Sequence, residues 1–92
     1  MSNNRTTLTI DNALGLHARP AALFVQTAKK YPDCEIMVAK DGNVVNGKSI
    51  MGLMMLAAAQ GTEITIEASG KDADMALQEL VHLVKNKFGE EE

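Results

Sequence analysis

The sequence has little cysteine, few aromatic residues and no long apolar run. Its single cysteine, Cys34, has no partner for an internal disulfide and no neighbours at metal-ligand spacing, so we expect a small strand residue. The longest apolar run, residues 50–59, is ten residues long. A membrane-spanning helix needs roughly 18. Because the chain also starts without an apolar signal region, we expect a cytoplasmic protein with no membrane insertion.

The chain also lacks a basic surplus. Its 92 residues carry a net charge of −3, and only 3% of them are aromatic. A nucleic-acid-binding α+β domain is therefore disfavoured, because no strand combines basic and aromatic residues. The length and the 46% of hydrophobic residues fit one domain over residues 1–92, with a modest core and no disulfides. We expect a monomer, with a strand-exchanged dimer as the alternative.

Hydrophobic periodicity predicts alternating strands and helices. Polar and apolar residues alternate at 7–10, 35–40 and 63–68, which indicates half-buried strands, and extended structure resumes at 43–45. Helical spacing predicts helices over 18–30, after Ser49 and over 72–88. Asp-Gly at 41–42 lies between two extended runs and predicts a hairpin. The predicted order is βαββαβα, a two-layer α+β fold in which three helices cover one face of an antiparallel sheet.

The end of the chain carries weaker signals. Ser69 and Asp72 have the spacing of a capping box before the final helix. His82 falls in the polar part of that helix and is expected to be exposed and without function. Gly89 and the three glutamates after it predict a frayed acidic tail over residues 89–92.

The most informative motif is Gly-Leu-His-Ala-Arg-Pro-Ala at 15–21. Proline is favoured in a helix's first turn, which places His17 at or near the N-cap, where backbone amides and the helix dipole favour an anion. Arg19 can recognise phosphate oxygens. Taken singly, such a histidine is more often a cap or a surface residue, and such an arginine a solvated charge. Together they suit a histidine that carries a phosphoryl group.

The chemistry predicted for His17 is nucleophilic. A neutral imidazole nitrogen attacks a phosphoryl group and forms a phosphohistidine. The helix N-terminus disfavours the imidazolium cation, and after transfer the amides and Arg19 can stabilise the phosphate. Such a site needs no cofactor, and no metal of its own if the donor enzyme supplies one. The chain has no Gly-rich phosphate loop and no metal-ligand spacing that would offer another site.

A second unusual segment, residues 50–56, is apolar nearly throughout. On a helical wheel its large residues form two arcs, Leu53 with Leu56, and Ile50 with Met51 and Met54. Either this helix is buried almost all round, or the leucines face the core and the other arc is a docking patch. Methionine suits docking because its flexible thioether adapts to several partners.

Ser49 precedes this segment and is expected to be its N-cap. It is also a candidate phosphorylation site, because the helix terminus tolerates a phosphate. A phosphate beside the patch would repel an acidic partner.

Together these residues resemble the HPr family, the histidine-containing phosphocarriers of the bacterial phosphoenolpyruvate-dependent phosphotransferase system. The resemblance covers nearly the whole chain. It is carried by GLHARPA at 15–21, KSIMGLM at 48–54, GTEITI at 61–66 and the final helix.

The resemblance implies an open-faced β-sandwich of four antiparallel strands and three helices. It implies that His17 takes a phosphoryl group on Nδ1 from phosphorylated enzyme I and passes it to a histidine of an enzyme IIA domain, with Arg19 assisting. Such a carrier is consumed and regenerated stoichiometrically rather than acting as an independent enzyme. Ile50, Met51 and Met54 match the family's partner-binding patch. Ser49 matches the regulatory serine that HPr kinase phosphorylates in some lineages.

Two alternatives stay open at this point. Leu14, just before Gly15, is closer to the nitrogen-regulatory branch of the family, whereas Lys48-Ser49-Ile50-Met51-Gly52 is closer to the kinase-regulated branch. The physiological branch is therefore undecided. The second alternative to a sugar-system carrier is a regulatory binding module that acts through phospho-Ser49 and the apolar patch.

Overall fold

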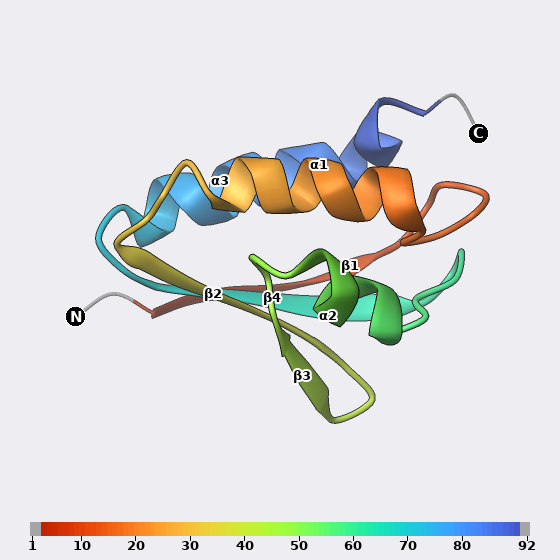
Figure 1. The fold of residues 1–92 in the computed structure, drawn as a ribbon, viewed down its shortest axis with the longest axis horizontal. Helices are drawn as coiled ribbons and strands as arrows, with labels where there is room; N and C mark the ends of the chain where they lie inside the picture. Colours follow the sequence, from red (N-terminus) through yellow and green to blue (C-terminus); the bar gives the residue numbers. More distant parts are fainter. Residues whose placement is uncertain (1–2, 91–92) are drawn as a thin grey trace.

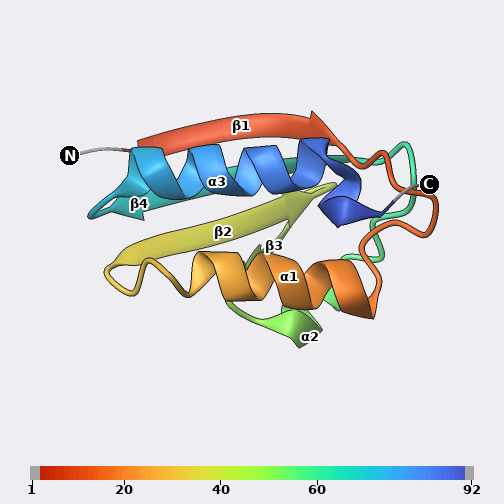
Figure 2. The ribbon, with the colours of Figure 1, turned by 90° about the horizontal axis from the view of Figure 1, so that it is seen from above.

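The computed structural model describes residues 3–90, which form a four-stranded sheet with helices on one face. The elements in chain order are β1 (Asn3–Thr9), α1 (Ala18–Ala28), β2 (Cys34–Lys40), β3 (Asn43–Asn46), α2 (Ile50–Met55), β4 (Glu63–Gly70), α3 (Ala73–Lys85) and the 3₁₀ turn η1 (Lys87–Gly89). The strand order is β1-β4-β2-β3, and every neighbouring pair is antiparallel. Figures 1 and 2 show α1 and α3 side by side over the sheet. The predicted βαββαβα order and two-layer α+β fold are confirmed.

The core lies between the sheet and these two helices. The inward residues predicted for β2 and β4 are all buried, and they meet the apolar faces of α1 and α3. They are Ile36, Val38, Ile64, Ile66 and Ala68 from the sheet, with Ala21, Phe24, Val25 and Ala28 from α1. Period-2 and period-3.6 patterns therefore identified both surfaces of the core.

The predicted hairpin between β2 and β3 is confirmed. Asp41 and Gly42 have φ angles of 52° and 84°, the left-handed conformation that a tight turn between twisted strands requires.

The last helix begins where it was predicted to begin, but the predicted capping box and the predicted end of the helix are wrong. Ser69 belongs to β4, and the N-cap is Asp72, whose φ of 62° is left-handed and whose side chain makes no capping hydrogen bond. The capping box does not form because Ser69 continues the pairing of β4 with β1 and β2. The helix stops at Lys85, and Phe88 reaches the core from a left-handed turn instead of a further helical turn.

The tail also differs from the expectation of a frayed end. Gly89 belongs to η1, and the side chain of Glu90 is hydrogen bonded within the fold. Residues 91–92 of the predicted tail lie outside the described residues. Within residues 3–90, no helix combines the length and the hydropathy needed to cross a membrane.

Candidate functional site

His17 is the N-cap residue of α1, as the proline signal predicted. Its backbone is extended (φ −81°, ψ −169°), and its carbonyl accepts the first helical hydrogen bond, from Ala21 N at 2.9 Å. Its side chain makes no capping bond, and about a third of that side chain is exposed (34%). The ring and the N-terminal end of the helix dipole therefore lie at the same place, which favours a bound anion.

The loop before His17 is held tightly against the connection between α2 and β4. Leu16 N donates to Ala58 O at 2.8 Å, and Gly15 N donates to Asn12 O at 3.1 Å. Gly15 has a φ of +69°, and a Cβ atom there would lie 2.3 Å from Ala58 O. Only glycine fits this position, so the glycine of the motif sets the path of the chain into His17.

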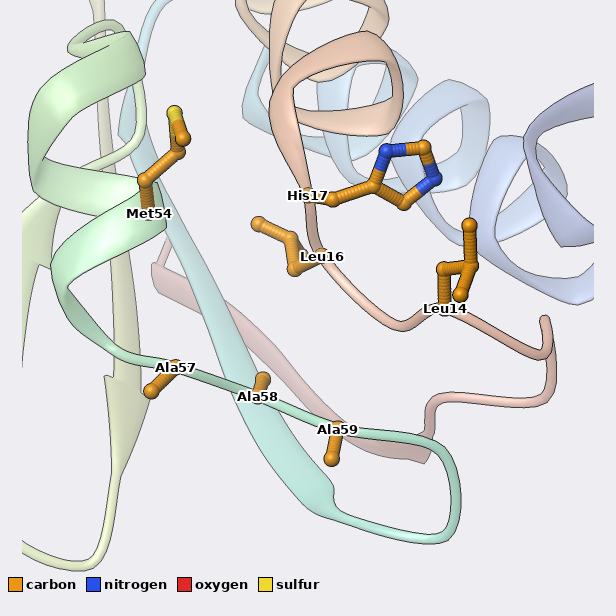
Figure 3. A pocket seen from close by; sticks show the side chains of 7 residues that line it. All are labelled: Leu14, Leu16, His17, Met54, Ala57, Ala58 and Ala59. Atoms are coloured by element: carbon orange, nitrogen blue, oxygen red, sulfur yellow. The ribbon is translucent and has the colours of Figure 1, made fainter.

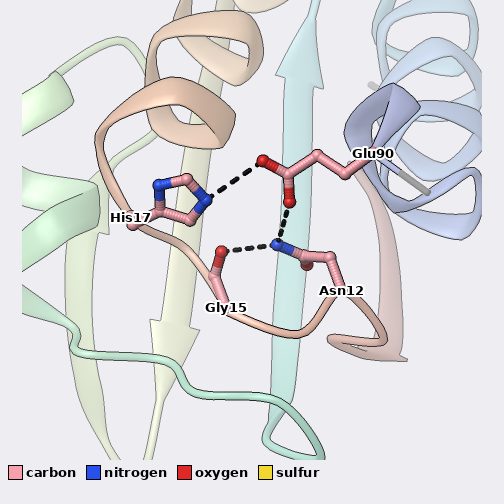
Figure 4. A network of polar contacts seen from close by, with 4 residues as sticks. All are labelled: Asn12, Gly15, His17 and Glu90. Atoms are coloured by element: carbon pink, nitrogen blue, oxygen red, sulfur yellow. Dashed lines mark hydrogen bonds and ion pairs between the residues drawn. The ribbon is translucent and has the colours of Figure 1, made fainter. Parts of the chain in front are cut away.

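A carboxylate from the far end of the chain contacts the His17 ring. Figure 4 shows Glu90 between His17 and Asn12: its Oε2 lies 3.1 Å from His17 Nε2, and its Oε1 accepts from Asn12 Nδ2 at 3.0 Å. Asn12 is fully buried, and its Nδ2 also donates to Gly15 O at 2.7 Å. Neither Asn12 nor Glu90 was singled out from the sequence, because no local spacing connects residues 78 positions apart.

Arg19 lies in the first turn of α1 and is exposed. It forms no ion pair with any carboxylate within residues 3–90. Its guanidinium is thus available near the helix N-terminus for an anionic group, although it has no hydrogen bond to His17.

The two faces of α2 are the ones that the helical wheel separated. Leu53 and Leu56 are buried, whereas Met51 is 75% exposed and Ile50 and Met54 are exposed to a lesser degree. The interpretation of a helix buried all round is therefore wrong. Met55, 79% exposed, extends the apolar surface and had been assigned to neither arc.

Ser49 is the N-cap of α2, as predicted. Its Oγ accepts a hydrogen bond from Gly52 N at 3.0 Å, and the residue is partly exposed. At the other end of α2, the Lys40 ammonium donates to Leu56 O at 3.0 Å and to Ala57 O at 3.3 Å, which neutralises the carbonyl end of the helix.

A shallow depression of about 260 Å³ joins His17 to α2. It is lined by Leu14, Leu16, His17, Met54, Ala57, Ala58 and Ala59. Figure 3 shows Met54 and His17 on opposite sides of it, above the small alanine side chains. An open apolar hollow beside an imidazole ring suits a protein surface that docks against it better than a small molecule that must be enclosed.

The other candidate residues lie elsewhere. Cys34 is buried at the start of β2, and burial raises the pKa of its thiol despite the nearby Lys48 charge, which leaves it a poor nucleophile. The exposed His82 shares a hydrogen bond with Asn86 at 2.8 Å. No group of three potential ligands among residues 3–90 is placed to hold a metal.

Comparisons with known proteins agree with this geometry. The family model described as "PTS HPr component phosphorylation site" matches residues 4–86. The HPr of Neisseria meningitidis serogroup A is 49% identical, over 96% of this chain and 98% of its own. The HPr-like protein Crh of Bacillus subtilis is 51% identical, over 79% of this chain and 85% of its own.

A solved structure of Thermoanaerobacter tengcongensis HPr has 50% identity and a TM-score of 0.92, with 97% of this chain and 99% of that chain covered. Solved structures of HPr from that organism and of Crh also include dimers. The chain therefore belongs to the HPr family of phosphocarrier proteins of the phosphotransferase system and carries a phosphoryl group on a phosphorylation-site histidine.

Proposed function

We propose that His17 is the residue that carries the phosphoryl group and that Arg19 binds the phosphate oxygens. The observation that carries this proposal is the placement of His17 as an uncapped N-cap, with its ring beside the free amides of α1. The chain has only two histidines. The other, His82, lies on α3 and lines none of the hollow beside α2.

Membership in the HPr family implies enzyme I and enzyme IIA domains as partners. We assign their docking to Ile50, Met51 and Met54, called here the α2 patch. Two properties support this assignment. The patch is exposed, and one of its members shares a hollow with His17, so a partner seated on it would reach the ring.

Phosphoryl transfer to His17 needs no general base, because the attacking nitrogen already has a free lone pair. Nδ1 of a neutral His17 attacks the phosphorus atom of the donor. The N–P bond forms while the donor's bond to phosphorus breaks, and that electron pair stays with the donor. The acceptor histidine later repeats the same displacement on phosphorylated His17.

A second candidate function is regulatory binding through phosphorylated Ser49. It is supported by the partial exposure of Ser49 next to the α2 patch. A relative also supports a regulatory function: Crh of Bacillus subtilis, whose solution structure is similar to this chain, is described as the catabolite repression HPr. An HPr kinase would be the partner in this case. Whether the carrier serves the sugar or the nitrogen branch is set by the acceptors that it meets.

We also propose that the protein is a cytoplasmic monomer without affinity for nucleic acid. The free Cys34 suits a reducing compartment, and the net charge of −3 opposes binding to polyanions. Because related chains form dimers, the mass in solution is the test of oligomeric state.

The decisive experiment is intact-mass measurement after incubation with enzyme I, phosphoenolpyruvate and magnesium, for the wild type and His17→Ala. We expect an acid-labile gain of about 80 Da, one phosphoryl group, that is absent from the variant. A variant that still gains this mass would overturn the assignment of His17.

The same assay separates the two functions. Ser49→Ala should accept the phosphoryl group from enzyme I as the wild type does and should resist labelling by HPr kinase, whereas His17→Ala should show the reverse pattern. A wild type that is inert with an enzyme I proven active on another carrier would favour the regulatory function.

A further inference from the structure

The end of the chain is folded back toward the start of α1 by an unusual turn. Lys87, Phe88 and Gly89 have φ angles of 56°, 55° and 78°, three left-handed residues in succession. Each non-glycine residue in this conformation costs about 1–2 kcal/mol, so the turn persists only because other contacts hold it. Phe88, buried in the core, is the main anchor. Glu90 follows directly, and its backbone N donates to Lys87 O at 2.9 Å.

Both oxygens of the Glu90 carboxylate are used within the fold. Asn12 Nδ2 donates to Oε1, and Oε2 faces His17 Nε2. The buried amide of Asn12 has two acceptors in front of it, Gly15 O and Glu90 Oε1, and only the NH₂ group can serve both. This orientation makes Asn12 a fixed donor that holds the carboxylate in place.

The contact determines which His17 nitrogen is the nucleophile. An ionised carboxylate can only accept, so Nε2 must carry the proton. In a neutral imidazole the other nitrogen, Nδ1, then has the free lone pair. Figure 4 shows the Nε2 side of the ring turned to Glu90 and the second nitrogen turned away from it.

We propose that Glu90 is a positioning residue for phosphoryl transfer: its carboxylate holds His17 as the Nε2–H tautomer, with Nδ1 free, and balances the positive charge of the phosphorylated ring. This inference rests on the proposed role of His17. When Nδ1 bonds to phosphorus the ring keeps its Nε2 proton and becomes cationic. A carboxylate already hydrogen bonded to that proton stabilises the product and the transition state before it.

The test measures transfer from phosphorylated enzyme I to the wild type, Glu90→Ala and Glu90→Gln. We expect Glu90→Ala to lower kcat about 10-fold, which is the smaller of the losses typical when a group that hydrogen bonds the other nitrogen of a functional histidine is removed. KM should be unchanged because the docking surface is intact. Glu90→Gln keeps a carbonyl acceptor but no charge and should fall between. The matched control is Glu35→Gln, an exposed carboxylate at the start of β2, at the opposite end of α1 from His17.

If the chain end were only structural, removing the Glu90 carboxylate would not change the exchange of the His17 ring proton with water. The NMR signal of that proton is therefore the second readout. We expect the Nε2–H proton of ¹⁵N-labelled His17 to be observable in the wild type and to exchange faster with water in Glu90→Ala. A wild-type kcat in Glu90→Ala, or a proton on Nδ1 in the neutral wild-type ring, would overturn the inference.

His17→Ala, assayed in parallel, distinguishes the two levels of failure. If His17→Ala still accepts the phosphoryl group, the proposed function itself is wrong. If His17→Ala blocks transfer and Glu90→Ala matches the wild type, only the role of Glu90 is wrong.

Discussion

Single residues of the loop before α1 decide where His17 stands. Gly15 combines a left-handed backbone with a close approach to the carbonyl of Ala58, and Leu16 N bonds to the same carbonyl. Position 15 accepts only glycine for two separable reasons, which are the left-handed backbone conformation and the lack of space for a Cβ atom. Gly61 shares only the first of these, because its φ is also positive but nothing lies within 4 Å of where its Cβ would be.

We predict that Gly15→Ala lowers the free energy of unfolding by about 2–4 kcal/mol, because the left-handed conformation costs about 1–2 kcal/mol and the clash with backbone atoms adds a similar amount. Urea unfolding measures this loss. Gly61→Ala is the control, since Gly61 also has a positive φ (+87°) but has open space where its Cβ would lie. Equal losses in the two variants would show that the approach to Ala58 is not limiting.

At the level of elements, α2 has one face buried in the core and one exposed apolar face, to which we assign docking. Its two leucines are buried, and the α2 patch is exposed next to the His17 hollow. With six residues, α2 is too short to be stable alone, so its position depends on the Ser49 cap, the leucines and the Lys40 contacts. The patch can therefore be altered without disturbing what holds the helix.

We predict that Met51→Asp raises KM for enzyme I by about 10-fold or more, because a charge must be desolvated in an apolar interface. The free energy of unfolding should change by less than about 0.5 kcal/mol, as for most exposed positions. Steady-state transfer kinetics and urea unfolding check the two parts. The control is Met75→Asp, an exposed methionine on α3, which should leave KM unchanged. An unchanged KM in Met51→Asp would remove the α2 patch from the docking surface.

At the scale of the whole molecule, a polar cluster ties the end of α1 to α3. The Glu79 carboxylate on α3 accepts hydrogen bonds from the Lys30 ammonium and the Tyr31 hydroxyl. The bond from Lys30, followed by that from Tyr31, lowers the pKa of Glu79 below its ordinary value of 4.5. The same contact raises the pKa of the Tyr31 phenol, chiefly because the hydrogen bond to Glu79 holds its proton. This cluster links the two helices that cover the sheet.

We predict that Glu79→Gln lowers the free energy of unfolding by an amount that depends on pH. Because the pKa of Glu79 is lower in the folded state, its contribution is present above pH 4.5 and is lost as the pH falls below that value. The side chains of Glu79 and Lys30 are 35% and 59% exposed, so solvent screening limits the loss of unfolding free energy at pH 7 to about 0.3–1 kcal/mol. Urea unfolding at pH 7 and pH 3 measures it. Glu35→Gln should show no such dependence, and a Glu79→Gln deficit of the same size at both pH values would contradict the prediction.

The sequence by itself determined the layer structure, the inward faces and the place of His17 on α1. These follow from local rules: the alternation in β4 has period 2, α1 has period 3.6, and Pro20 marks a first helical turn. It also identified α2 as a helix with two apolar arcs. Which arc is exposed was decided by the packing of Leu53 and Leu56 against the core, which no local pattern can express.

Only the tertiary structure decided two features, the start of α3 and the surroundings of the His17 ring. At the start of α3 the capping box does not form, because the pairing of β4 outweighs a local side-chain hydrogen bond at Ser69. Glu90 meets Asn12 and His17 because the burial of Phe88 bends the chain end through left-handed residues. Contacts between residues so far apart arise from the summed burial of the whole core, so the sequence predicted the position of His17 but not its contact with Glu90.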